Sequence, residues 1–416
     1  MQKINHIKNL ILFLLIFNVT FLPTLIMSIF KTSSFSLGFL LSCLLSCLSI
    51  LYVKNEKMFF SKKNIFVSVV IFIFVIFHFM VIYIFQIGTG DVNLEKFLFS
   101  FFLLMLIFFN AILISTYFSK INDFRILFLC FKIIFIFFLL CATFGMLKID
   151  PFGVRTGKTM LVFLEPSHFA IVVAPFFIFY FIRSNYLSKF FLFLFFFLVA
   201  TLMKNLTMMV VLFFSIILSF KTKLFRCSNN VIIISFLILF NFINDFSNNY
   251  YLDRLNFSRD SNNFSTLVLM QGWENTFLNF FNSYGLGVGF QQLGFNGYEG
   301  EISSKILSML KNEHGLNRRD GGSTAPKIIS EFGFFGIVFL IIYLRLFIKS
   351  FNYIRKYCLG KFKGNNNVDI ILFCHVAVVS LSIDLFIRGL AYFSSAYFIF
   401  FIAIYYLSLI SDNKNM

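Results

Sequence analysis

Residues 94–118, LEKFLFSFFLLMLIFFNAILISTYF, decide the class of this protein, because the run is apolar apart from a few polar positions, with its only charges, Glu95 and Lys96, at its start. An α-helix of about 20 apolar residues crosses the roughly 30 Å hydrocarbon core of a bilayer. Similar runs recur through all 416 residues, of which 59% are hydrophobic and only 13% are charged. Soluble domains have about 25% charged residues, so the composition excludes that class and predicts an all-α integral membrane protein.

About twelve apolar runs are expected to form transmembrane helices, with a range of about 11 to 14. The clear runs lie at residues 10–30, 35–53, 64–87, 94–118, 125–147, 166–183, 231–246, 326–348, 367–384 and 389–410. The stretch 187–220 is interrupted by Lys204-Asn205, and we interpret it as two short spans that meet in an outer hairpin. One continuous span is the alternative for this stretch.

The distribution of basic residues predicts the orientation of the chain in the membrane, since cytoplasmic connections carry an excess of Lys and Arg. With the N-terminus inside, the cytoplasmic segments contain 20 of the 35 basic residues and only 4 of the 18 acidic residues. Both termini are therefore expected in the cytoplasm. The net charge of +17 is spread over short connections, so we assign it to membrane topology and anionic membrane lipids, and expect no nucleic-acid partner.

The predicted spans divide the chain into three parts. Residues 1–246 contain helices one to nine and an outer loop at 148–165, residues 247–325 form one large extracytoplasmic loop, and residues 326–416 contain helices ten to twelve. Loops of about 80 residues are uncommon without a function. Within this one, we expect a helix near 261–281, a glycine-rich turn and a second helix near 301–312.

The glycine-rich turn reads GLGVGF at residues 285–290. A nucleotide-binding loop is disfavoured, because no strand precedes it and no Lys-Ser/Thr pair follows it. Glycines that permit a tight turn against the membrane surface are the better interpretation.

A second polar cluster precedes the run 166–183. Pro166 is typical of the first turn of a helix, which places Glu165 at the N-cap. The unpaired N–H groups and partial positive charge of this helix end attract anions. Glu165 and His168 are three residues apart and share one helix face, so that they can share a proton or a substrate hydroxyl. Ordinary capping by Glu165, with His168 as an interfacial residue, is the alternative.

Charged residues near the ends of predicted spans are costly to bury and are candidates for function. Lys204, Asp384 and Arg388 all fall at the predicted outer side. Asp384 and Arg388 are four residues apart, so a structural ion pair on the helix surface is the alternative for these two.

Four pieces of the sequence together resemble one family. They are Arg155 followed by EPSHFA at 165–170, the large loop with Arg254 and Arg259, the GLGVGF turn, and EFGFFG at 331–336. In their order and topology they resemble the bacterial O-antigen and capsule repeat-unit polymerases of the Wzy type, which are related to the O-antigen ligases. The sequence departs from the ligase pattern at two places, and both departures favour a polymerase. Lys204-Asn205 stands in place of a Ser-Arg pair, and Gly315 follows His314 in place of an Asn.

The resemblance implies an inverting membrane glycosyltransferase of the GT-C type in the bacterial inner membrane. It would transfer the growing chain from undecaprenyl diphosphate to the non-reducing end of an incoming lipid-linked repeat unit, so lipid-linked oligosaccharides are both donor and acceptor. A chain-length regulator is a candidate protein partner. No cofactor is expected, and a metal-independent mechanism is the hypothesis, because no acidic cluster has the spacing of metal ligands.

This chemistry assigns roles to the polar residues. An acceptor hydroxyl benefits from a base, for which Glu165, His168 and His314 are the candidates. A leaving diphosphate is stabilised by fixed cations. The candidates for that role are Arg155, Arg254, Arg259, Lys204 and Arg388.

Two other functions remain open. An O-antigen ligase would transfer the finished polymer to a lipid A-core acceptor. A lipid-linked oligosaccharide flippase also has about twelve spans, but such transporters usually show two similar halves, and this sequence has no internal repeat.

Overall fold

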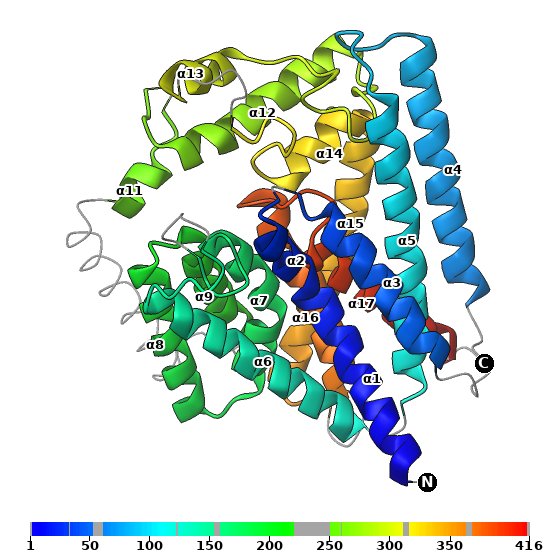
Figure 1. Cartoon of the computed structure of the whole chain (residues 1–416), viewed down its shortest axis with the longest axis vertical. Coiled ribbons are helices and arrows are strands. Elements are labelled where there is room, and N and C mark those ends of the chain that lie inside the picture. The colour runs from blue at the N-terminus through cyan, green and yellow to red at the C-terminus, as the bar shows by residue number, and fades with distance from the viewer. Residues whose placement is uncertain are drawn as a thin grey trace.

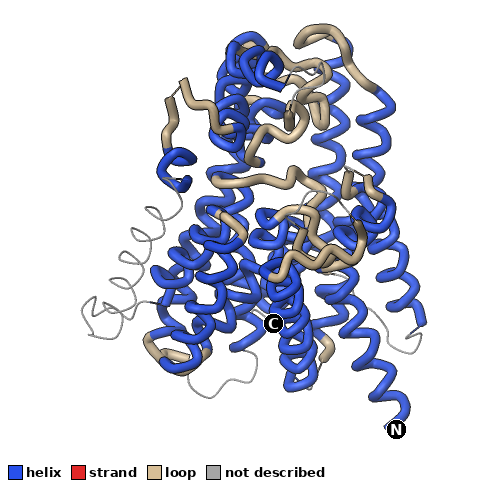
Figure 2. The backbone as a smooth tube through the Cα atoms, turned by 60° about the vertical axis from the view of Figure 1, so that its left-hand side comes forward, coloured by secondary structure: helices blue, strands red, loops and turns tan. Residues whose placement is uncertain are grey.

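A computed structural model describes residues 2–32, 34–52, 61–121, 124–153, 159–219, 250–258, 260–310, 316–362 and 368–413. The regular structure of these residues is helical (Figure 2). The helices are α1 Gln2–Thr20, α2 Leu22–Phe30, α3 Ser36–Tyr52, α4 Lys62–Ile84, α5 Leu94–Ser119, α6 Phe124–Met146, α7 Pro166–Arg183, α8 Tyr186–Leu202, α9 Leu206–Ser219, α11 Tyr250–Leu255, α12 Phe264–Asn282, α13 Glu301–Leu310, α14 Thr324–Phe332, α15 Phe334–Cys358, α16 Val368–Phe386 and α17 Ser395–Asn413.

The prediction of an all-α membrane protein is confirmed. In the described residues, 6 helices are long and apolar enough to cross a membrane, namely α4, α5, α6, α7, α15 and α16. The bent pair of α1 and α2 raises this number to 7, while α3, α8, α9 and α17 are shorter apolar helices. The predicted run 231–246 lies outside the described residues.

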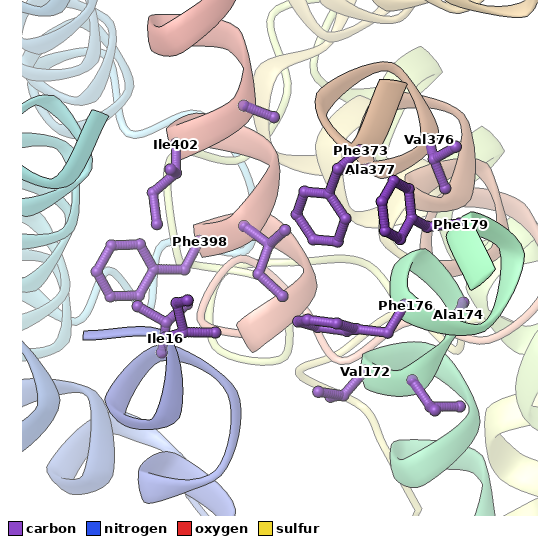
Figure 3. Packing of buried hydrophobic residues seen from close by; sticks show 14 of the residues in the cluster. Ile16, Val172, Ala174, Phe176, Phe179, Phe373, Val376, Ala377, Phe398 and Ile402 are labelled. Atoms are coloured by element: carbon purple, nitrogen blue, oxygen red, sulfur yellow. The ribbon is translucent and has the colours of Figure 1, made fainter. Parts of the chain in front are cut away.

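The core of the helix bundle is built around α7 and α16, the two most buried of these candidate spans. Figure 3 shows Phe176 of α7 and Phe373 of α16 facing one another, with their ring centroids 5.2 Å apart. Phe398 of α17 and Ile16 of α1 pack in the same cluster. Burial of large apolar side chains on both helices stabilises their pairing, which fixes the position of the polar N-terminus of α7.

The predicted span 10–30 is broken into two helices. α1 and α2 meet at an angle of 56°, and Pro23 occupies the first turn of α2. Proline is tolerated there because that N–H has no partner within the helix. The break directs the end of α2 and the following turn toward the polar part of the molecule.

The predicted break within 187–220 is confirmed, because α8 and α9 are separate helices; both are shorter apolar helices and are not among the candidate spans. Lys204 adopts a positive φ of 49° at the break. The next residue, Asn205, accepts a hydrogen bond from the backbone N–H of Met208 at 3.2 Å, which caps α9. Its Nδ2 donates to the carbonyl oxygen of Pro166 at 2.7 Å. Asn205 therefore ties the α8–α9 turn to the first turn of α7.

Three helices from the second half of the chain, α12, α13 and α14, form a cap above the helix bundle, beside the upper ends of α4 and α5 (Figure 1). The helices predicted near 261–281 and 301–312 correspond to α12 and α13. The predicted span 326–348 is correct only from residue 334 onward, where it coincides with the candidate span α15. Its start is wrong, because the helix breaks at Gly333, where φ is 56°. Residues 324–332 form α14, which packs against α12 in the cap, and α15 begins after the break.

The glycine-rich turn at 285–290 holds the cap at this break. Gly285 accepts a hydrogen bond from the N–H of Phe334 at 2.7 Å, and the N–H of Gly289 donates to the carbonyl oxygen of Glu331 at 2.9 Å. A Cβ atom on Gly333 would lie 1.9 Å from the carbonyl oxygen of Gly285. The glycines thus permit two backbone segments to cross in direct contact.

Replacing Gly333 with alanine is expected to lower the free energy of unfolding by at least about 2 kcal/mol, because strain at the positive φ adds to a backbone collision. Gly360 is the matched control, since it has a φ of 73° and open space around its Cα. G360A should cost only about 1 kcal/mol. The measurement is the thermal unfolding of the detergent-solubilised protein. Equal effects of G333A and G360A would show that the crossing does not constrain the fold.

Candidate functional site

A large cavity lies between the cap and the bundle, where connections distant in sequence meet. Its volume is about 1360 Å³, larger than the roughly 300–1,000 Å³ of most small-molecule pockets. The lining comes from the turn after α2, the first turns of α5 and α7, the loop at 291–295, the loop at 316–322, Lys327 of α14 and residues 388–393. These dimensions suit an extended ligand.

The cavity lining carries far more positive than negative charge. Two lining residues are acidic, Glu165 and Asp320. Six are basic, namely Lys31, Lys96, Arg318, Arg319, Lys327 and Arg388. The N-terminus of α7 adds the partial positive charge of its unpaired N–H groups. The field in this cavity therefore attracts anions.

Glu165 lies at the N-cap of α7, as predicted, but its side chain does not cap the helix. Its Oε2 instead accepts a hydrogen bond from Ser167 Oγ at 3.1 Å and lies 3.6 Å from His168 Nε2. The same oxygen is 3.4 Å from Arg388 Nη2. The shared face of Glu165 and His168 is confirmed, and Arg388 joins them from a segment beyond α16.

These contacts set the charge of Glu165. Burial pushes the pKa of this carboxyl upward, but the charges of His168 and Arg388 and the hydrogen bond from Ser167 together hold the pKa below its usual value. With 49% of its side chain exposed, Glu165 is ionised at neutral pH and reachable from the cavity. It can accept a proton or a hydrogen bond from a ligand hydroxyl.

A buried ion pair stands in the wall formed by α14. The side chains of Lys327 and Glu331 are only 2% and 0% exposed, and Nζ lies 3.7 Å from Oε1. Lys327 Nζ also donates to the carbonyl oxygen of Arg319 at 2.6 Å and to Gln291 Oε1 at 3.3 Å. Burial raises the pKa of Glu331, against the opposing effect of Lys327. The lysine is therefore a cation fixed by three acceptors at the edge of the cavity.

Lys327 and Glu331 were not predicted as site residues, because both fell within the predicted span 326–348. The sequence did contain an indication of this ion pair, since a Lys and a Glu four residues apart share a helix face. Charges in an apparent span are also candidates for function.

The alternative of an ion pair between Asp384 and Arg388 is wrong. Asp384 is buried near the end of α16 and accepts hydrogen bonds from Thr324 Oγ1 at 2.5 Å and from the N–H of Leu390 at 3.4 Å. Arg388 contacts Glu165 instead. Asp384 therefore connects α16 to the first residue of α14, while Arg388 belongs to the cavity.

Arg254 and Lys204 do not line the cavity. Arg254 lies in α11, where its Nη2 donates to Ser265 Oγ at 3.1 Å, and Lys204 is exposed at the α8–α9 turn. The other predicted site residues, Arg155, Arg259 and His314, lie outside the described residues. Among the predicted diphosphate-binding cations that the structure describes, which are Lys204, Arg254 and Arg388, only Arg388 is found in the cavity lining. The other cations found there come from the α2–α3 turn, α5, the 316–322 loop and α14.

No group of three or more His, Cys, Asp or Glu side chains gathers as a metal site within the described ranges. Comparison of the chain with protein-family models, curated proteins and solved structures gave no match. Inference about function therefore depends on the sequence and on the geometry of the cavity.

Proposed function

We propose that this protein is a membrane glycosyltransferase that polymerises lipid-linked oligosaccharide repeat units. The observation that carries the proposal is an ionised glutamate facing a strongly cationic cavity at the junction of apolar helices and a polar cap. The order of motifs that resembles Wzy-type polymerases adds to it. The growing chain is transferred from undecaprenyl diphosphate to the non-reducing end of an incoming lipid-linked unit.

The reaction needs a base on one side of the anomeric carbon and cations on the other. Glu165 accepts the proton of the acceptor hydroxyl as its oxygen attacks the anomeric carbon, with His168 and Arg388 orienting the carboxylate. The bond to the diphosphate breaks, its electron pair stays on the leaving oxygen, and the configuration at carbon inverts. His314 stays the second predicted base.

The departing diphosphate gains negative charge, which preplaced cations stabilise. Arg319 and Lys327 are suited to this role, because Lys327 is held by buried acceptors and the Arg319 guanidinium lies 4.2 Å from the ring centroid of Phe295. Arginine forks match the geometry of phosphate oxygens. Arg155, Arg254 and Arg259 stay predictions from the family resemblance.

Two lipid carriers must reach one reaction site, and the dimensions and position of the cavity support this. The volume of about 1360 Å³ accommodates a sugar diphosphate together with an acceptor sugar. The proposal includes a GT-C type fold with about twelve spans in the bacterial inner membrane, both termini in the cytoplasm, and a chain-length regulator as a partner.

Glu165→Gln is expected to lower the polymerisation rate about 100-fold or more, because the amide cannot accept the proton. The measurement is the ladder of products that the purified protein in proteoliposomes forms from lipid-linked repeat units. Glu95→Gln is the matched control, since Glu95 is exposed and does not line the cavity. A normal ladder from E165Q would contradict the role of this residue. In cells, a ligase defect would leave long polymers on the carrier, and a flippase defect would leave single repeats on the inner leaflet.

Arg319→Gln is expected to weaken use of the diphosphate substrate about 10-fold or more, because one charge-assisted contact to phosphate is lost. The effect should appear in kcat/KM for the lipid-linked donor in the same assay. Arg345→Gln, an exposed position on α15, serves as the control. Unchanged kcat/KM in R319Q would remove Arg319 from the diphosphate site.

Arg388→Gln is expected to shift the acid limb of the pH–rate profile to higher pH. The base must be ionised, so activity is present above the pKa of Glu165 and is lost as the pH falls through it. Removing a cation 3.4 Å from the carboxylate raises that pKa, and the variant therefore loses activity at a higher pH than the native protein. An acid limb that stays in place would exclude Glu165 as the titrating base.

A further inference from the structure

A second cavity lies on the outside of the cap, between α12 and the start of α13. Its volume is about 890 Å³. The aromatic residues Trp273, Phe277 and Phe257 line it together with the acidic residues Glu299 and Glu301. We call this cavity the α12 groove. It shares no lining residue with the cavity that contains Glu165.

The aromatic rings of the α12 groove face outward. Phe277 and Phe257 are 59% and 57% exposed, and neither belongs to a candidate membrane span, in which exposed apolar side chains would face lipid. Trp273 and Phe277 are four residues apart on α12, so they lie on one face of that helix. Phe281 continues the same row and is 71% exposed. An exposed aromatic row in a groove marks a binding surface.

Two side-chain hydrogen bonds join the helices α12 and α13, which form the framework of the groove. Glu274 on α12 accepts a hydrogen bond from the N–H of Ile302 at 2.9 Å, and Gln271 Nε2 donates to Ser303 Oγ at 2.9 Å. These buried contacts fix the first turn of α13 against α12. The groove therefore exists before any ligand binds, which lowers the cost of binding.

One ion pair connects the two cavities. Arg318 lines the cavity that contains Glu165, Glu299 lines the α12 groove, and the two side chains are bonded to each other. The linings of the two spaces therefore meet at this pair. A chain that leaves the reaction cavity past Arg318 would reach Glu299 in the lining of the α12 groove.

The lining of the groove fits a saccharide. Sugar rings have C–H faces that pack on aromatic rings, and their hydroxyl groups donate hydrogen bonds to carboxylates. An anionic membrane surface fits less well, because the carboxylates that line the groove would repel it.

We propose that the α12 groove is a saccharide-binding site, which holds sugar residues of the polymer at a distance from the reacting bond. This inference rests on the proposed function, because the sugar chain is the product of that reaction. Sugars held in the groove keep the growing chain close to the reaction cavity between transfers.

The experiment uses Trp273, which is the only tryptophan in the chain, so that emission excited selectively from tryptophan in the full-length protein reports on the groove. The probe is lipid-free oligosaccharide, released by mild acid from the surface polysaccharide of the source cells and added to the detergent-solubilised protein. We expect a saturable change in Trp273 emission. Phe277→Ala should weaken binding about 5-fold, because one ring contact is lost. Phe66→Ala, at an exposed position of α4, should leave the affinity unchanged.

Two results would overturn the proposal. One is a failure of the oligosaccharide titration, either because Trp273 emission does not change or because F277A binds the oligosaccharide with unchanged affinity. The other is a change caused by phosphatidylglycerol vesicles and not by oligosaccharide, which would assign the groove to the membrane surface.

Failure of the groove and failure of the proposed function can be told apart. E165Q should bind the oligosaccharide normally but polymerise about 100-fold or more slowly, whereas F277A should form polymer of shorter average length. Normal binding together with full polymerisation by E165Q would contradict only the proposed reaction of Glu165. If E165Q loses polymerisation and no saccharide binding is detected, only the assignment of the groove as a saccharide site is contradicted.

Discussion

The architecture depends on one close contact between backbones, in which the turn at 285–289 crosses the break between α14 and α15. Hydrogen bonds from Phe334 to Gly285 and from Gly289 to Glu331 join the two segments, and no side chain fits between them. This contact fixes α14 in the cap instead of letting it continue as part of α15. Lys327 consequently lies at the wall of the cavity. Without the break, the same lysine would belong to an apolar span, where an ammonium is costly.

The pKa values of the two glutamates of this region shift in opposite directions because their surroundings differ. Glu165 is partly exposed beside Arg388 and His168, which keeps its pKa low, whereas burial raises the pKa of Glu331 despite Lys327. Glu165 lines the cavity and presents its carboxylate there, whereas Glu331 is fully buried behind the lysine that it helps to position. Such a division of roles by environment is common where two carboxyl groups serve one site.

Part of the candidate site could be predicted from local sequence. Pro166 indicated the start of α7, and the spacing of Glu165 and His168 placed both on one face, as the structure confirms. Arg388 was named for its position near a helix end, yet its partner is Glu165 rather than Asp384. Arg254 was chosen for its charge, but its position in α11 lies outside the cavity lining.

The sequence by itself determined the membrane class, most helix boundaries and the polar N-terminus of α7, because hydropathy and capping act between near neighbours in the chain. Only the tertiary structure decided which charges meet. Arg388 reaches Glu165 across 223 residues, and Lys327 enters the cavity because a glycine with positive φ interrupts an apolar run. Both outcomes depend on how distant segments pack, and no local pattern of residues encodes that packing.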